Sequence, residues 1–288
     1  MINIVCTSQA DHLGRKLRKN SGFKVFFLEK NRDGKRYFPD GELYAKLNSA
    51  NKIVGRTIIL HSGSPKPQDG IVELKMTLDI LREAGSKNLE VFFAYFPFGM
   101  QDHITDEGET NVAENLVKEL VSYYKVKKIY TIDAHFWGRD WLKKYPLVNF
   151  SAVDLLKKEV ETDYSDLVYL APDAGSEMRT GIKGAKKKRL NSFTTEYTGN
   201  DWLEQKVKNK NVAVVDDLLE TGGTMCRFYD ECKKYGAKDV VAVITHGVLK
   251  KGIRRVKEKY SKLYLSNTIK QKEAKIDACD LITEVLEK

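Results

Sequence analysis

The chain has few cysteines and no long hydrophobic run, and each absence excludes a class of protein. Its four cysteines show no CxxC spacing, so neither a zinc site of that type nor a disulfide framework is supported. No apolar run approaches the ~20 residues that a membrane-spanning helix needs. The N-terminus also lacks the basic region and apolar stretch of a signal peptide. The sequence therefore predicts a cytoplasmic protein without a membrane partner.

The composition is that of a folded chain. Of its 288 residues, 42% are hydrophobic and 10% are aromatic, which argues against disorder as the main state. This length favours about two domains of ordinary size.

The net positive charge favours an anionic ligand but does not identify which one. The formal net charge is +9 and the pI is near 9.1, yet most lysines and arginines have acidic neighbours and only residues 186–189 form a dense basic run. A basic balance suits a phosphorylated metabolite as well as a nucleic acid. We expect the small phosphate and no nucleic-acid partner.

Short apolar strands alternate with amphipathic helices along the chain. The runs that read as strands are 2–6, 24–28, 57–61, 90–95, 128–132, 167–170, 211–215, 240–245 and 262–265, and the helical patterns include 71–84, 111–124, 225–234 and 275–287. Strands that are apolar throughout are typical of parallel sheets covered on both faces. The pattern predicts an α/β fold, with domains at 1–146 and 147–288 because one βα series ends near Tyr145-Pro146.

Polar clusters follow four of these strands. They are the segments 61–65, 133–135, 171–175 and 216–224. Ligands of open α/β sheets bind beyond the carboxyl ends of the strands. One acidic residue at such a place often caps a helix, but acids at three strand ends make capping alone a weak explanation.

The segment 214–225, VVDDLLETGGTM, carries the most specific pattern. Its glycines precede a predicted helix, whose first N–H groups suit a phosphate. The paired acids before them suit sugar hydroxyls, which donate to carboxylates. Together they predict a pentose-phosphate site formed by Asp216, Asp217, Glu220, Thr221, Gly222, Gly223 and Thr224.

This segment resembles the phosphoribosyl-diphosphate (PRPP) signature of the type I phosphoribosyltransferases. Nearly the whole chain resembles the ribose-phosphate diphosphokinase (PRPP synthetase) family, through segments 38–42 (FPDGE), 95–103 (YFPFGMQDH), 131–135 (TIDAH), 172–175 (PDAG), 245–249 (THGVL) and 266–269 (SNTI). The resemblance implies two phosphoribosyltransferase-type domains, each a mainly parallel sheet flanked by helices. It also implies a homo-oligomer with its active site near a subunit interface.

The implied reaction transfers the diphosphoryl group of ATP to the 1-hydroxyl of ribose 5-phosphate, which gives PRPP and AMP with Mg²⁺ as cofactor. By resemblance, His135 and Asp173 are the metal-associated residues, and Lys187 and Arg189 stabilise the transition state. The residues implied to bind ATP are Phe38, Asp40 and Glu42, which come from the adjoining subunit, and Gln101, Asp102 and His103.

Three departures from the family pattern leave alternatives open. Met100 stands where the family places an arginine, so His103, Lys66 or Arg179 compensates or the nucleotide binds differently. Gly175-Ser176-Glu177 stands where the family tends to have consecutive glycines before an arginine such as Arg179, and an added carboxylate there must point away from a diphosphate or help to hold a cation. The interval from Asp173 to Lys187 is short for the family, so Lys186 or Lys188 could be the true counterpart of the catalytic lysine.

Two other functions remain as alternatives. One is a catalytically weak homologue that binds nucleotide or sugar phosphate and regulates a partner, which Met100 and the short segment before Lys187 motivate. The other is a phosphoribosyltransferase that consumes PRPP, which would explain the 214–225 segment but not the N-terminal half.

Overall fold

The chain forms two compact units. The computed structural model describes residues 2–20, 22–189, 195–198 and 200–288, and for residues 20, 186–189, 195–198 and 200 it describes the backbone alone. One unit comprises Met1–Phe150, Thr268–Lys270 and Cys279–Lys288, and the other comprises Ser151–Asn267 and Gln271–Ala278. These units differ from the predicted domains 1–146 and 147–288, because residues 147–150 pair with the first sheet and the C-terminal helix packs on the first unit.

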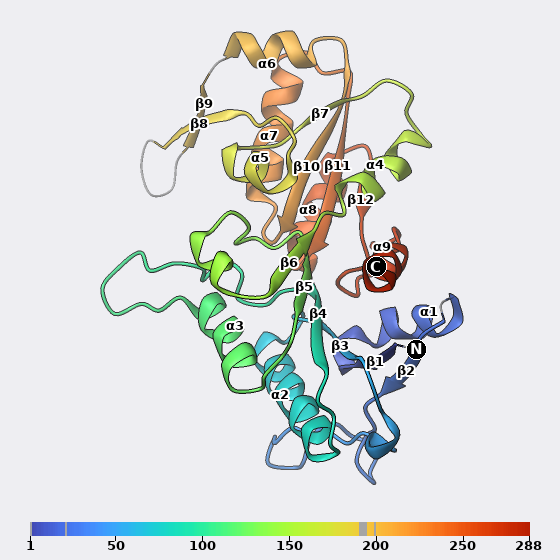
Figure 1. Ribbon diagram of the computed structural model, residues 1–288. Helices are drawn as coiled ribbons and strands as arrows, with labels where there is room; N and C mark the ends of the chain where they lie inside the picture. The colour runs from blue at the N-terminus through green and yellow to red at the C-terminus, as the bar shows by residue number, and fades with distance from the viewer. Residues whose placement is uncertain (1, 21, 190–194, 199) are drawn as a thin grey trace. The chain divides into compact units, whose positions relative to one another are not determined.

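The first unit contains a six-stranded parallel sheet (Figure 1). Its strands are β1 (Asn3–Cys6), β2 (Lys24–Phe27), β3 (Thr57–Ser62), β4 (Leu89–Tyr95), β5 (Ile129–Ile132) and β6 (Leu147–Phe150), in the order β2-β1-β3-β4-β5-β6. β3 is buried along its whole length and β4 along nearly all of it. This burial explains why both strands are apolar at successive positions.

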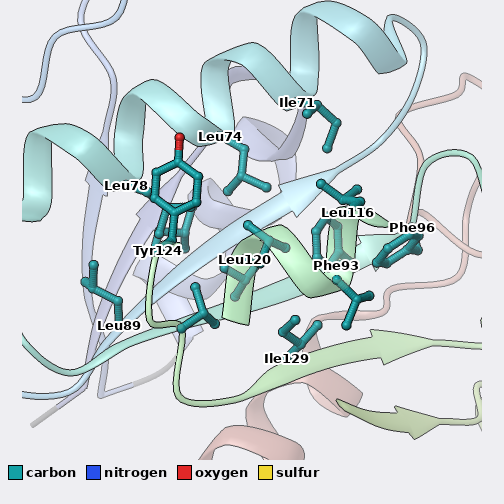
Figure 2. Packing of buried hydrophobic residues seen from close by; sticks show 14 of the residues in the cluster. Ile71, Leu74, Leu78, Leu89, Phe93, Phe96, Leu116, Leu120, Tyr124 and Ile129 are labelled. Atoms are coloured by element: carbon teal, nitrogen blue, oxygen red, sulfur yellow. The ribbon is translucent and has the colours of Figure 1, made fainter. Parts of the chain in front are cut away.

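Helices cover both faces of this sheet. They are α1 (Asp11–Asn20), α2 (Pro67–Glu83), α3 (Val112–Ser122) and α9 (Cys279–Glu287), with short 3-10 turns η1 (Ser8–Ala10), η2 (Ala50–Lys52) and η3 (Asp140–Lys144). Leu74 of α2 and Leu120 of α3 pack with Phe93 of β4 in the core (Figure 2). Gly14 of α1 lies against Cys6, whose side chain points to the opposite face from that of Val5.

The second unit contains a four-stranded parallel sheet and a two-stranded antiparallel one. The first consists of β12 (Leu263–Leu265), β11 (Asp239–Gly247), β10 (Asn211–Leu219) and β7 (Val168–Leu170), in that order, and the second of β8 (Lys186–Arg189) and β9 (Thr195–Thr198). The helices are α4 (Val153–Glu161), α5 (Ala174–Thr180), α6 (Asn200–Val207), α7 (Gly223–Lys234) and α8 (Lys250–Lys259). Side chains of α6, α7 and α8, such as Val207, Phe228 and Val256, share one core with β10 and β11.

The predicted fold class is confirmed, since both larger sheets are parallel and flanked by helices. All four cysteines are buried as thiols. In the part of the chain that the structure describes, no helix is long and apolar enough to cross a membrane.

Candidate active site

The aspartate pair lies inside strand β10, not after it as predicted. The strand was expected to end at Val215, but Asp216 and Leu219 still pair with β11. Asp216 is 6% exposed and Asp217 is fully buried. A strand can bury two adjacent acids only if donors satisfy them, and the second unit supplies those donors.

Side chains of α5 hold both acids. Ser176 donates its hydroxyl to Oδ1 of Asp216 at 2.8 Å, and the backbone N–H of Asp217 donates to the same oxygen at 3.0 Å. Arg179 donates from Nε to Oδ1 of Asp217 at 2.7 Å. Burial, and then the neighbouring Asp217 carboxylate, raise the pKa of Asp216 well above its usual value. Burial thus favours the protonated form of Asp216, whereas the Arg179 guanidinium lies directly on the carboxylate of Asp217.

The predicted phosphate loop follows this strand directly. It passes through half-buried Glu220 and exposed Thr221 to Gly222, whose φ of 76° is a left-handed conformation that glycine adopts without strain. Helix α7 then begins at Gly223, where an added Cβ would make only an ordinary van der Waals contact, 3.7 Å from Oγ1 of Thr221, and Thr224 is half-buried beside it. The first N–H groups of α7 point out of the helix, as an anion site requires.

Helix α8 supports the loop from behind. A Cβ on Gly252 would lie 1.9 Å from the carbonyl oxygen of Glu220, so only glycine allows this approach. Arg255 donates to the carbonyl oxygen of Thr221 at 3.0 Å. The backbone of the loop is thus held in place by its neighbours.

Asp173 begins helix α5 at the end of β7. Its Oδ1 accepts from the backbone N–H of Ser176 at 3.0 Å, which is an N-cap. The carboxylate of Glu177 accepts from the backbone N–H of Gly184 at 3.0 Å and from Lys183 at 3.2 Å. Glu177, the added acid that departs from the family pattern, therefore has donors from residues close to it in the sequence.

The segment 36–44 of the first unit forms a small antiparallel turn. Phe38 donates its N–H to the carbonyl of Glu42 at 2.8 Å, and Asp40 accepts from the N–H of Glu42 at 3.0 Å. The side chains of Asp40 and Glu42 are exposed, and the Phe38 ring is 43% exposed although it is large and apolar. A cavity of about 530 Å³ lies beside it, lined by Lys30, Asp33, Gly34, Lys35, Arg36, Tyr37, Phe38 and Pro39.

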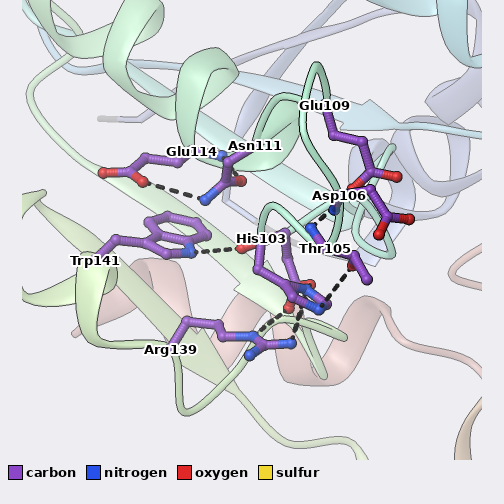
Figure 3. Close-up of polar contacts among 9 residues, drawn as sticks. His103, Thr105, Asp106, Glu109, Asn111, Glu114, Arg139 and Trp141 are labelled. Carbon is purple, nitrogen blue, oxygen red and sulfur yellow. Dashed lines mark hydrogen bonds and ion pairs between the residues drawn. The ribbon is translucent and has the colours of Figure 1, made fainter.

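Asp102 is the centre of a polar cluster in the loop after β4 (Figure 3). Arg139 donates to its carboxylate from Nε at 2.7 Å and from Nη2 at 3.2 Å, and Nδ1 of His103 lies 2.6 Å from Oδ1. Burial alone would raise the pKa of Asp102, but the hydrogen bonds from Arg139 and His103 outweigh it and lower the pKa below its usual value. Asp102 is thus a buried carboxylate that stays charged, next to exposed Gln101 and His103.

His135 follows β5, and its Cβ lies 3.4 Å from where a Cβ on Gly99 would be. The loops after β4 and β5 are therefore in contact. Asp133, between strand and histidine, has a φ of 37°, and its N–H donates to the carbonyl of Phe150 at 2.8 Å. This left-handed backbone turns the chain sharply at the strand end.

The two predicted catalytic residues lie on β8. Lys187 is opposite Tyr197 of β9, and Arg189 is opposite Thr195, in antiparallel register. Their side chains lie outside the described residues, as do those of Lys186 and Lys188. The choice among these lysines stays a prediction.

All three cations proposed to replace the missing arginine have carboxylate partners. Lys66 lies 3.2 Å from Asp69 and Arg179 is tied to the buried Asp217. Nδ1 of His103 lies 2.6 Å from Oδ1 of Asp102. Arg139 was not among the candidates, although its side chain is 41% exposed at the same place.

The donor set suits a metal that needs few protein ligands. Among the residues described, no group of three or more His, Cys, Asp or Glu side chains could hold a metal ion. Mg²⁺ prefers oxygen ligands and usually keeps several waters, so one or two carboxylates plus substrate phosphates suffice. Asp173, which follows β7 and caps α5, carries a carboxylate of this kind.

Sequence reasoning missed the partners that hold the predicted residues. Ser176, Gly252, Arg255 and Arg139 all act through contacts with distant segments. Glycine inside a basic helix is a signal that could have indicated a close approach at Gly252. No pattern in the sequence around Arg139 indicates its contact with Asp102.

The fold and the loop define the class of protein. Residues 146–281 match the phosphoribosyl transferase domain family, and residues 2–123 match the N-terminal domain of ribose phosphate pyrophosphokinase. Both units are thus phosphoribosyltransferase-type domains. A crystal structure of phosphoribosylpyrophosphate synthetase from Mycobacterium smegmatis has the same fold, with a TM-score of 0.77 at 19% identity over 100% of this chain and 98% of that one.

Curated relatives identify the family. A ribose-phosphate pyrophosphokinase of Thermococcus kodakarensis is 32% identical over 273 residues, covering 91% of this chain and 92% of its own length. One of Pyrococcus furiosus is 30% identical over 299 residues, covering 98% and 99%. The chain belongs to the ribose-phosphate pyrophosphokinase family, as the sequence motifs predicted.

Proposed function

We propose that this chain is a ribose-phosphate diphosphokinase that transfers the β,γ-diphosphoryl group of ATP to the 1-hydroxyl of ribose 5-phosphate. The products are PRPP and AMP, and the class is a transferase of nucleotide biosynthesis. The observation that carries the proposal is the buried Asp216-Asp217 pair leading into the open glycine loop of β10 and α7, in a chain of this family.

The second unit binds ribose 5-phosphate. The N–H groups of Gly223 and Thr224 and the hydroxyl of Thr221 are the donors for the 5-phosphate, because they gather at the start of α7 and Oγ1 of Thr221 lies 3.7 Å from the Cβ position of Gly223. Asp216 and Asp217 accept from the ring hydroxyls. This arrangement fixes the sugar at both ends, so its 1-hydroxyl is presented in one orientation.

The first unit binds the nucleotide. The exposed ring of Phe38 offers a face for adenine, and Asp40 and Glu42 accept from its amino group. Gln101, Asp102 and His103 form the second nucleotide segment. In this proposal Phe38, Asp40 and Glu42 serve the active site of an adjoining subunit, so the enzyme works as a homo-oligomer.

Lys187 and Arg189 stabilise the transition state. Transfer of a diphosphoryl group needs positioning and charge neutralisation more than covalent catalysis. Residues two apart on a strand share one face, so β8 is suited to present both cations to the developing charge.

Mg²⁺ is the proposed cofactor, and Asp173 and His135 are each proposed to associate with it. A hard cation favours Asp173 as a direct ligand, while His135 acts through coordinated water. When bound, the ion neutralises the charge of the phosphates. Cytoplasmic location and the absence of a nucleic-acid partner stay predictions.

The test is product formation from ribose 5-phosphate and Mg²⁺ with ATP, GTP, CTP or ADP as separate donors. We expect AMP and PRPP in equal amounts from ATP. Product from another donor alone would keep the reaction and reassign the nucleotide. No product from any donor, by protein that still binds ribose 5-phosphate, would favour the regulatory homologue.

A further inference from the structure

We propose that Arg139 is the cation of the nucleotide segment and binds the phosphate chain of the nucleoside triphosphate. This inference rests on the proposed function and names a further residue of the same site. It starts from Met100, which is 55% exposed and brings no charge to that segment. An anionic chain bound beside Met100 needs a cation from elsewhere in the unit.

Arg139 reaches the segment because two loops pack together. Its backbone N–H donates to the carbonyl of Phe136 at 3.2 Å. Phe136 is fully buried, and its ring packs edge-on against Phe96 of the loop after β4, with centroids 4.8 Å apart. Trp141 donates from Nε1 to the carbonyl of Asp102 at 3.2 Å. The loop after β5 is therefore fixed against the nucleotide segment, and the guanidinium is placed with it (Figure 3).

The pair with Asp102 leaves much of the Arg139 side chain exposed to solvent. The Asp102 side chain is 5% exposed, whereas that of Arg139 is 41% exposed. A guanidinium has five N–H donors, and the contacts with Asp102 involve Nε and Nη2 only. The two donors of Nη1 are not used by Asp102 and can bind phosphate oxygens. The buried carboxylate orients the side chain, as carboxylates commonly do for arginine in anion sites.

The other cations are less suited to this task. Lys66 lies against Asp69 and accordingly has a carboxylate of its own on the surface. Arg179 belongs to the second unit and holds Asp217. Nδ1 of His103 lies 3.0 Å from Nη2 of Arg139 and 2.6 Å from the same Asp102 carboxylate, so this ring nitrogen is already engaged.

Equilibrium binding of Mg–ATP and of adenosine, without ribose 5-phosphate, tests the proposal. Arg139→Ala should weaken ATP binding about tenfold or more, because a charge-assisted hydrogen bond is lost, and should leave adenosine affinity unchanged. Met100→Arg in the Arg139→Ala background should restore most of the ATP affinity. Lys143→Ala is the matched control, since the Lys143 side chain is 82% exposed four residues away and pairs with Asp140, not with Asp102.

The outcomes separate a phosphate contact from a structural ion pair. If Arg139 contacts the phosphates, Arg139→Ala lowers the affinity for ATP and leaves the affinity for adenosine unchanged. Equal loss for ATP and adenosine would show that Arg139 only holds the loop, and retained ATP affinity would show that it does nothing here; either result overturns the inference while leaving the proposed function intact. Wild-type protein that binds no ATP would overturn both.

Discussion

Gly252→Ala is the substitution that best tests the geometry of the sugar-phosphate loop. The new Cβ would lie 1.9 Å from the carbonyl oxygen of Glu220 and 3.1 Å from the N–H nitrogen of Gly222. Cβ atoms essentially never approach other atoms within 3.0 Å, so α8 or the loop must move by about 1.1 Å. Overpacking of this kind costs about 1–3 kcal/mol. A displacement of 1 Å in a positioned site can cost about 100-fold.

We therefore expect Gly252→Ala to lower the free energy of unfolding and to weaken ribose 5-phosphate binding by at least about tenfold. Urea denaturation and calorimetric titration measure the two quantities. Gly14→Ala is the matched control, because its Cβ would lie 2.3 Å from Sγ of Cys6 in the first unit. It should cost similar stability and leave sugar-phosphate affinity unchanged.

Unchanged ribose 5-phosphate affinity in folded Gly252→Ala would refute the assignment of the loop. If that variant does not fold, Arg255→Ala tests the same assignment of the loop with a smaller structural perturbation. It removes the hydrogen bond to the carbonyl of Thr221, which should weaken sugar-phosphate binding a few-fold with little change in stability.

Three further substitutions test other parts of the account. Lys187→Ala should lower kcat by about 100-fold or more with ribose 5-phosphate affinity retained, and a wild-type rate would exclude this lysine. Phe38→Ala should weaken ATP binding about tenfold by loss of stacking, and titration showing unchanged affinity would contradict an adenine contact. Asp216→Asn should raise stability by about 1 kcal/mol at mildly alkaline pH. The raised pKa of Asp216 means that wild-type stability falls as pH rises from the unfolded-state pKa through the folded one, so urea denaturation should show a smaller pH dependence in the variant.

The strands were predictable because parallel strands buried on both faces are apolar at several successive positions. Residues 58–60 of β3, 91–94 of β4 and 212–215 of β10 show this directly. The end of β10 was not predictable, because two acids look like the start of a loop. They continue the strand only because Ser176 and Arg179 satisfy them from α5. β6 was not predicted either, since the strand is only four residues long and three of them are half-buried.

The candidate site was predictable where it is local in sequence. The acids and glycines of 214–225 lie within one strand, turn and helix, so their spacing carries the chemistry. The contact between Arg139 and Asp102 joins residues 37 positions apart in two loops. No pattern in either loop specifies that contact, because it depends on the packing of Phe96 against Phe136.

The most direct test of the central claim follows the fate of labelled phosphate. Wild-type protein is incubated with Mg²⁺, ribose 5-phosphate and ATP that is radiolabelled in its γ-phosphate, and the products are separated. The account predicts that the label appears in PRPP, with an equal amount of unlabelled AMP. Label in a monophosphoryl product together with ADP, or no transfer by protein that binds both substrates, would contradict it.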